Sequence, residues 1–246
     1  MANTYTQSFE ISPNMVDCFG RAKPSTLLYL AQEAAGGHCR QLQLDWDTLA
    51  AKGLFWAVIR YRVRVNRLPQ LGETVTVETW PMPTTRTAFP RATVARDAKG
   101  EELFHTIGLW VLMDAENRTM VLPGKSGVDL VGLSRGDELA PPSSLMPVVG
   151  EKFQCRRVGY TDLDRNGHMN NTRYMNWVDD LLPAEFHRDH PVTEFTLCYL
   201  SEAREGEDLR LNWTMTDGPV LQVDGIREMT EETGKSARVF SAKVAF

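Results

Sequence analysis

The chain has 246 residues, of which 42% are apolar, and a formal net charge of −5 at pH 7. This length allows one large buried core or two domains of about 120 residues each. The negative balance argues against a general nucleic-acid or membrane-surface binder, because those proteins need a basic surface. The four cysteines are widely spaced without a C-x-x-C pair, which predicts free thiols rather than a zinc site or a disulfide framework.

The N-terminal sequence MANTYTQSFEIS lacks the apolar region of a signal peptide. No stretch of about 20 apolar residues, the length that a membrane-spanning helix needs, occurs in the chain. We therefore expect a soluble, cytoplasmic protein with no membrane partner.

The first half of the chain reads as a strand, an amphipathic helix and then a run of strands. The helix presents one face at helical spacing, made of Leu27, Leu30, Ala31, Ala34, Ala35 and His38. Strands are expected at about 5–12, 54–66, 73–80, 86–96 and 103–114. Residues 123–150 are dense in Pro, Gly and Ser, which is typical of a linker. We place a first unit at 1–130, the linker at 131–150 and a second unit at 151–246.

The second half repeats this order of elements. A strand at 152–160 precedes a polar turn and a helix, which Pro183 ends. The apolar positions of that helix are Tyr174, Trp177, Val178 and Leu181. Further strands are expected at about 193–201, 207–215, 220–229 and 236–246.

The two halves also share residues at one constant offset, which pairs Asp17 with Asp162 and Tyr29 with Tyr174. The segment LGETVTV (71–77) is similar to EGEDLRL (205–211). This self-similarity predicts a duplicated α+β unit, in which a long helix is wrapped by an antiparallel sheet.

The polar stretch DLDRNGHMNN at 162–171 is rich in proton-transfer groups, among them Asp164, Asn166 and His168. At the predicted offset the first half has Phe19, Arg21 and Lys23 instead, which favours a single functional site in the second half. Helix amides near His168, capped by Asn170 or Asn171, would stabilise a developing oxyanion. Glu202, at the end of an apolar strand, is the candidate base or nucleophile. Turn chemistry for the polar stretch and a solvated charge for Glu202 are the alternatives.

Three longer segments resemble one family: YTDLDRNGHMNNTRYMNWVDD, LFWAVIRYRVRVNRLPQLGETVTVETWP and LWVLMDAENRTM. They resemble the fatty acyl-[acyl carrier protein] thioesterases, which include plant plastid enzymes and shorter bacterial relatives, and the likeness covers nearly the whole chain. The resemblance implies a tandem (double) hot-dog fold whose second unit is catalytic. The first unit would be a degenerate copy that helps to form the acyl-chain pocket. The implied catalytic residues are Asp164, Asn166, His168 and Glu202, with no metal and no cofactor.

The implied reaction is hydrolysis of the thioester between a fatty acyl chain and acyl carrier protein (ACP). Glu202 would activate a water or attack directly, and His168 would assist. The thioester carbonyl oxygen would lie near the main-chain amides of Gly167 and His168 or near the Asn166 side chain. The resemblance implies a bacterial-type cytoplasmic enzyme, and either a monomer or a homodimer fits. The alternatives are an acyl-coenzyme A thioesterase, a dehydratase on the same fold, and a non-catalytic module that binds acyl thioesters.

Because ACP is acidic, a local basic surface is expected on the chain. Arg60, Arg62 and Arg64 alternate along one strand and share a face, which is either this surface or simply the solvated face of a sheet. The other candidates are Arg21, Lys23, Arg86 and Arg91.

Overall fold

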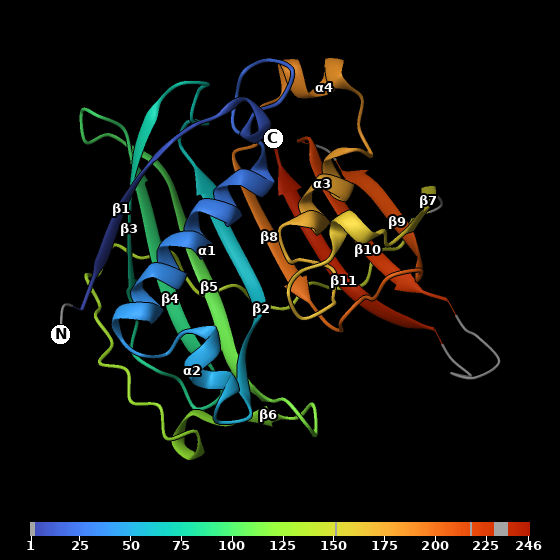
Figure 1. The fold of residues 1–246 in the computed structure, drawn as a ribbon. Coiled ribbons are helices and arrows are strands. Elements are labelled where there is room, and N and C mark those ends of the chain that lie inside the picture. Colours follow the sequence, from blue (N-terminus) through green and yellow to red (C-terminus); the bar gives the residue numbers. More distant parts are fainter. Residues whose placement is uncertain (1–2, 151, 217, 229–235) are drawn as a thin grey trace. The chain divides into compact units, whose positions relative to one another are not determined.

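The structure, a computed structural model, describes residues 3–150, 152–216, 218–228 and 236–246. It divides into two compact units, Met1–Pro142 and Ser143–Phe246 (Figure 1). The division lies inside the segment that the sequence predicts to be a linker, and the predicted domain limits themselves stay a prediction.

The first unit contains an antiparallel sheet in the order β1-β3-β4-β5-β2, and a short strand β6 pairs with β5. Its strands are β1 (Tyr5–Glu10), β2 (Leu54–Val65), β3 (Thr74–Pro81), β4 (Phe89–Arg96), β5 (Glu102–Asp114) and β6 (Met120–Val121). Its helices are α1 (Pro24–Gln41), α2 (Trp46–Ala50) and the 3₁₀ turns Pro13–Met15 and Pro123–Lys125. The predicted strands β1 to β5 are confirmed to within three residues at most ends, whereas α2 and β6 were not predicted.

Helix α1 lies across the sheet of its own unit (Figure 1). It has 18 residues and begins with Pro24, whose fixed φ suits the first position of a helix. All six residues of the predicted face are buried. The prediction of a long amphipathic helix is confirmed, and burial of this face against the sheet supplies most of the stability of such a helix.

The second unit contains an antiparallel sheet in the order β8-β11-β10-β9-β7. Its strands are β7 (Lys152–Arg157), β8 (Glu194–Tyr199), β9 (Asp208–Thr216), β10 (Val220–Arg227) and β11 (Ala237–Ala245). Its helices are α3 (Arg173–Asp179), α4 (Ala184–Asp189) and the 3₁₀ turn Tyr160–Asp162. The five strands match the predicted ones.

The helix of the second unit is shorter than predicted. Asn170 Oδ1 accepts from the amide and the hydroxyl of Thr172 at 2.9 and 2.8 Å, which forms a turn before the helix begins. The helix therefore starts at Arg173 with Thr172 as its N-cap, so the prediction of Asn170 or Asn171 in that role is wrong. At its other end α3 stops before Pro183, which leads into α4.

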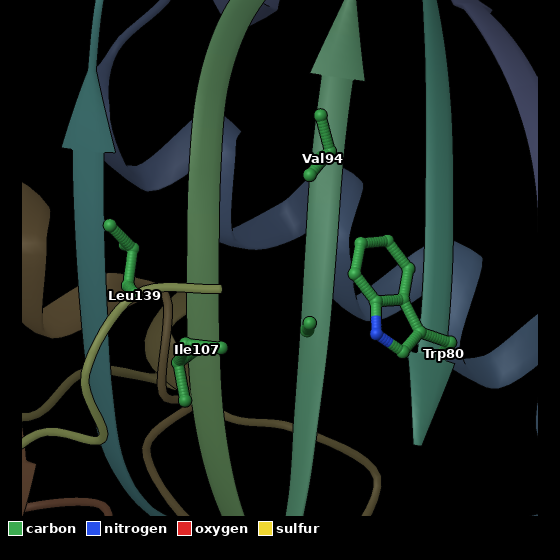
Figure 2. Packing of buried hydrophobic residues seen from close by; sticks show 5 residues of the cluster. Trp80, Val94, Ile107 and Leu139 are labelled. Carbon is green, nitrogen blue, oxygen red and sulfur yellow. The ribbon is translucent and has the colours of Figure 1, made fainter. Parts of the chain in front are cut away.

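Part of the segment predicted to be a linker packs on the first sheet. Leu139 is 8% exposed and belongs to a hydrophobic cluster with Trp80, Val94 and Ile107 (Figure 2). This face of the sheet is opposite α1, because neighbouring strand residues point to opposite faces and Thr79 contacts Arg91, which in turn contacts His38 of α1. Residues 133–139 are therefore a strap over this face.

Arg135 anchors the strap by two kinds of contact. Its guanidinium donates to both carboxylate oxygens of Glu78, at 2.9 and 2.6 Å. The same group lies 3.8 Å from the centre of the Trp80 ring, a cation–π contact. The composition, rich in Pro, Gly and Ser, predicts a segment without tertiary contacts. The contacts of Arg135 and Leu139 with the sheet show that the segment is packed instead.

Replacing Arg135 by alanine is expected to lower the free energy of unfolding by about 1–2 kcal/mol at neutral pH, through loss of the ion pair and the cation–π contact. Hydrogen bonding from Arg135 holds the pKa of the Glu78 carboxyl below its usual range. A carboxyl group whose pKa is lowered by folding stabilises the folded state at pH values above its pKa in the unfolded chain. This stabilisation is lost as the pH falls through the pKa of the folded state. The difference in the free energy of unfolding between Arg135→Ala and the wild-type chain should therefore become smaller at acidic pH.

Urea unfolding of both proteins at neutral and acidic pH measures this difference. Lys99→Ala removes a cation from the exposed β4–β5 turn and should change little. Equal stability of Arg135→Ala and the wild-type chain at neutral pH would contradict the anchoring role.

Candidate active site

The segment around His168 folds as a closed turn. Leu163 and Met169 form a bridge at its two ends. The Asp164 amide donates to the His168 carbonyl at 2.7 Å, and the Gly167 amide donates to the Asp164 carbonyl at 3.0 Å. Gly167 has a φ of +73°, a left-handed conformation that costs glycine little and most other residues more. The sequence DRNG thus forms a tight turn that presents His168 at its end.

The Asp164 carboxylate holds this turn from inside. Its Oδ1 accepts from the amide of Asn166 at 2.8 Å and from the amide of His168 at 3.3 Å. Its Oδ2 lies 3.4 Å from the side-chain amide of Asn166. Asp164 therefore fixes the main chain on which the two other polar side chains stand.

A second segment, which follows β8, brings Glu202 to the turn. The Met169 amide donates to the Ala203 carbonyl at 2.8 Å, and His168 forms a main-chain bridge with Arg204. These contacts place Glu202 Oε2 at 3.1 Å from His168 Nε2. The carboxylate that the sequence indicates as the candidate base thus lies next to the candidate histidine.

The two side chains of this pair differ in exposure. His168 is 9% exposed as a residue, whereas the Glu202 side chain is 40% exposed. Arg204 Nη2 lies 3.9 Å from the same Glu202 oxygen. The imidazole is thus buried, and the carboxylate beside it is accessible to a molecule from solvent. This arrangement suits proton transfer to and from such a molecule.

An aromatic cluster joins the two elements next to His168 and Glu202 in the sequence, α3 and β8. Tyr174 of α3 is 3% exposed, and its ring contacts Tyr199 of β8 at 5.5 Å and Phe240 of β11 at 4.8 Å. The Tyr199 hydroxyl donates to the Asn171 carbonyl at 2.8 Å. Helix α3 and strand β8, which carry the chain away from His168 and towards Glu202, are therefore packed on each other.

The expected oxyanion donors are only partly in place. The amides of Gly167 and His168 donate to Asp164 within the turn, so these two expected donors are already engaged. Residues 169–172 separate His168 from α3, which removes the predicted contribution of the helix amides. The Asn166 side-chain amide also contacts Asp164, at 3.4 Å, but it has two N–H groups and is exposed, so it stays the candidate donor.

The same closed turn occurs in the first unit. The Asp17 amide donates to the Arg21 carbonyl at 2.8 Å, and Asp17 Oδ1 accepts from the amides of Phe19 and Arg21, both at 2.9 Å. These are the hydrogen bonds that Asp164 makes in the second unit. Asp17 is therefore the counterpart of Asp164, and the predicted pairing with Asp162 is wrong by two residues.

Burial of the helices agrees with the corrected alignment. Tyr29 is 41% exposed, whereas Tyr174, its predicted partner, is 3% exposed. The corrected alignment pairs Tyr174 with Leu27, which is fully buried. Two tyrosines at a plausible spacing misled the sequence comparison, because neither their burial nor their contacts are visible in the sequence.

The correction changes which groups distinguish the two units. The Ala22 amide donates to the Pro69 carbonyl as the Met169 amide donates to the Ala203 carbonyl, so the residues before Pro69 and Ala203 correspond. Three candidate positions of the second unit therefore differ from the first: Asn166, His168 and Glu202 stand where the first unit has Phe19, Arg21 and Leu68. The prediction that the first unit lacks the acid as well is wrong, because Asp17 is that acid.

One basic residue proposed for ACP docking is not on the surface. Arg91 is 8% exposed, and its Nη1 lies 3.1 Å from His38 Nδ1 and donates to Thr79 Oγ1 at 3.3 Å. Its role as a docking residue is therefore wrong. Arg64 is accessible but paired with Glu102 at 2.9 Å, and a docking role for the alternating arginines of β2 stays a prediction.

Arg227, at the end of β10, is the residue near Glu202 that the sequence does not reveal. Its Nη2 donates to the Glu202 carbonyl at 2.6 Å. It stands 25 residues after Glu202 in an ordinary antiparallel strand, so no local spacing marks it. Strand register alone brings the two residues together.

Within the part of the chain that the structure describes, no group of three His, Cys, Asp or Glu side chains is arranged to hold a metal ion. None of the four cysteines, all of which the structure describes, forms a disulfide, and Cys198 is buried. Among the helices described above, none is long and apolar enough to cross a membrane.

Comparison with known proteins places the chain in a family. Residues 2–122 match the acyl-ACP thioesterase N-terminal domain, and residues 149–238 match the acyl-ACP thioesterase C-terminal domain. The chain belongs to the acyl-ACP thioesterase family. The predicted resemblance is confirmed, and the turn of His168 and Glu202 both lie in the part that matches the C-terminal domain of this family.

Two similar acyl-ACP thioesterases come from plants. A palmitoyl-acyl carrier protein thioesterase of Gossypium hirsutum is 26% identical over 228 residues, which cover 87% of this chain and 55% of that protein. A dodecanoyl-[acyl-carrier-protein] hydrolase of Umbellularia californica is 30% identical over 203 residues, 76% of this chain and 53% of that protein. The chain thus spans about half the length of the curated relatives it matches.

Solved structures of acyl-ACP thioesterases share the fold. An acyl-ACP thioesterase from Bacteroides thetaiotaomicron has a TM-score of 0.88 at 23% identity, over 99% of this chain and 98% of that one. The 12:0-ACP thioesterase from Umbellularia californica has a TM-score of 0.80 at 25% identity, over 98% of this chain and 93% of that one. The predicted α+β, hot-dog type of fold is confirmed by this likeness.

Proposed function

We propose that this chain hydrolyses the thioester of fatty acyl-ACP and releases a free fatty acid, which would terminate chain elongation. The contact of His168 Nε2 with Glu202 Oε2 at 3.1 Å carries the proposal, because it pairs an imidazole with a carboxylate that is open to solvent. Relatives are named for palmitoyl-, dodecanoyl- and oleoyl-ACP, so long acyl chains on ACP are the first substrates to test.

Glu202 acts on the thioester carbonyl by one of two routes. In the first it accepts a proton from water as the water oxygen bonds to the carbonyl carbon. In the second its own oxygen bonds to that carbon and forms an anhydride, which water then opens. In both routes the carbon–sulfur bond breaks when the tetrahedral intermediate collapses, and the phosphopantetheine thiolate leaves and is protonated. His168, whose Nε2 lies 3.1 Å from Glu202 Oε2, holds and moves the proton.

Asn166 and Asp164 have different tasks in this proposal. The Asn166 side-chain amide donates to the thioester carbonyl oxygen, where negative charge develops in the transition state. Asp164 is a positioning residue, because it bonds the amides of Asn166 and His168 rather than the open side of the site. The first unit, in which Phe19, Arg21 and Leu68 replace the reactive groups, is assigned to acyl-chain binding.

Thiol release from a ladder of acyl-ACP thioesters, about C8 to C18, beside the matching coenzyme A esters tests the function. Faster release from the ACP series is expected and also gives the chain-length preference. Faster release from coenzyme A would favour the alternative thioesterase, and a dehydrated acyl chain with its thioester intact would favour a dehydratase. Binding of both series without turnover would indicate a non-catalytic binding module.

The cytoplasmic location and the monomeric or homodimeric state stay predictions.

Replacing Asp164 by alanine is expected to lower kcat by about 10- to 100-fold, because Asn166 and His168 lose the acceptor that fixes their main chain. Asp164→Asn keeps an acceptor oxygen and should retain most of the activity. Asp17→Ala removes the matching carboxylate from the first unit and should lower the thermal midpoint with kcat unchanged.

Steady-state kinetics and thermal unfolding of the three variants measure this. If Asp164→Asn lost as much activity as Asp164→Ala, the carboxylate would be taking part in proton transfer itself, and the positioning role would be wrong.

A further inference from the structure

Arg227 joins the two ends of the turn that follows β8. Its Nη2 donates to the main-chain carbonyl of Glu202 at 2.6 Å and to Glu207 Oε2 at 2.6 Å, and its Nε donates to the same Glu207 oxygen at 3.1 Å. The Arg227 side chain is 24% exposed, and that of Glu207 is 28% exposed. One guanidinium thus fixes a carbonyl and a carboxylate at the same time, which its planar fork of donors allows.

The turn needs such a constraint. Gly206 has a φ of +81°, so the turn contains a residue with wide conformational freedom. The Glu202 side chain is 40% exposed, so tight packing does not hold its carboxylate, and its position depends on the main chain behind it. Arg227 is held in turn by the sheet, since it pairs with Leu209 of β9 and Ala237 of β11.

The geometry points to Arg227 as a positioning residue for hydrolysis: it fixes the main chain of Glu202 so that the carboxylate meets His168. This inference rests on the proposed function. Arg227 contacts the carbonyl of Glu202 and the carboxylate of Glu207, and it acts on the thioester only through Glu202. Small displacements of a reacting group cost much in rate, about 10²-fold for about 1 Å.

The first unit contains a similar clamp without the reactive carboxylate, but its arginine is the residue just before Leu68 and does not come from a facing strand. Arg67 donates to both oxygens of Glu73 at 2.9 and 2.6 Å, and its Nη1 lies 3.4 Å from the Leu68 carbonyl. In the corrected alignment Leu68 and Glu73 correspond to Glu202 and Glu207. A clamp of this turn therefore belongs to the fold of both units, and only in the second unit does the clamped carbonyl belong to a glutamate. Arg67 is thus a matched control.

Kinetics of Arg227→Ala, Arg227→Lys and Arg67→Ala with the acyl-ACP that the wild-type chain hydrolyses fastest test the inference. Arg227→Ala is expected to lower kcat by about 10- to 100-fold with KM unchanged within about twofold. Arg227→Lys should recover only part of this loss, because an ammonium lacks the planar fork. Arg67→Ala should lower the thermal midpoint and leave kcat as in the wild-type chain. Should Arg227→Ala fail to fold, Arg227→Lys carries the same comparison.

A double-mutant cycle separates positioning from a general loss of structure. In a Glu202→Gln background, Arg227→Ala should cause no further loss of the residual rate, because its effect passes through Glu202. The inference is overturned if Arg227→Ala retains the wild-type kcat, if its loss is the same in the Glu202→Gln background, or if Arg67→Ala loses as much kcat. A wild-type chain without activity would instead refute the proposed function, so the two failures are distinguishable.

Discussion

Glu202→Gln is expected to lower the kcat of acyl-ACP hydrolysis by about 10²–10⁴-fold, the range of a lost proton-transfer group. Glutamine has nearly the shape of glutamate but neither accepts a proton nor attacks a carbonyl in its place. The Glu202 side chain is 40% exposed, so its replacement should leave the thermal midpoint within a few degrees of the wild-type value. Steady-state rates together with thermal unfolding check both parts of the expectation.

Glu205→Gln is the matched control, because Glu205 is an exposed carboxylate on the same turn. It should retain the wild-type kcat. If the two variants were equally active, Glu202 would be an ordinary solvated charge at a strand end, and the site would have to be sought elsewhere.

His168→Gln is the second variant with a large expected effect, again about 10²–10⁴-fold in kcat. The imidazole contacts Glu202 at 3.1 Å, so its loss removes the group that shares the proton with the carboxylate. Because the two side chains form one pair, the Glu202→Gln, His168→Gln double variant should lose little more than either single variant.

Thermal unfolding must be measured beside these rates, because His168 is only 9% exposed and replacing a buried ring can lower the stability of the fold. His190→Gln, a change at an exposed histidine in the same unit, should leave kcat unchanged. Fully additive losses in the double variant would contradict a shared proton and indicate independent roles.

Elements with a strong local pattern were predictable from the sequence. The apolar face of α1 repeats at helical spacing from Leu27 to His38, and the strands alternate or run as apolar blocks between turn residues. The early end of the second helix was not predictable in the same way. A hydrogen bond that the Asn170 side chain accepts from the Thr172 amide competes with helix formation there, and sequence periodicity does not report such a bond.

The identity of the candidate residues could be predicted from the sequence, but the hydrogen bonds that position them could not. Asp164, Asn166 and His168 stand in one short stretch, and Glu202 ends an apolar strand, so residue type and position indicated them. The positioning role that we propose for Asp164 rests on a comparison that only the structure allows: Asp17 makes the same hydrogen bonds in the first unit, which has Phe19 and Arg21 in place of Asn166 and His168.

The contact of Arg227 with Glu202 is a long-range contact that no local sequence pattern predicts. Its contact with Glu202 arises from the register of β10 with its neighbours, across 25 residues of chain. The same holds for the strap, where the contact of Arg135 with Glu78 spans 57 residues. Local propensity determines the elements, and long-range pairing of side chains determines which of them support the site.

The most direct test is mass spectrometry of the products formed from a mixture of acyl-ACPs, about C8 to C18, in ¹⁸O-labelled water, with Glu202→Gln beside the wild-type chain. We expect the wild-type chain to release free fatty acid that carries solvent oxygen over many turnovers, together with ACP bearing a free thiol. We expect almost none of either product from the variant. Acyl-ACPs that all stay intact with the wild-type chain, or equal amounts of labelled acid from both proteins, would contradict hydrolysis through Glu202.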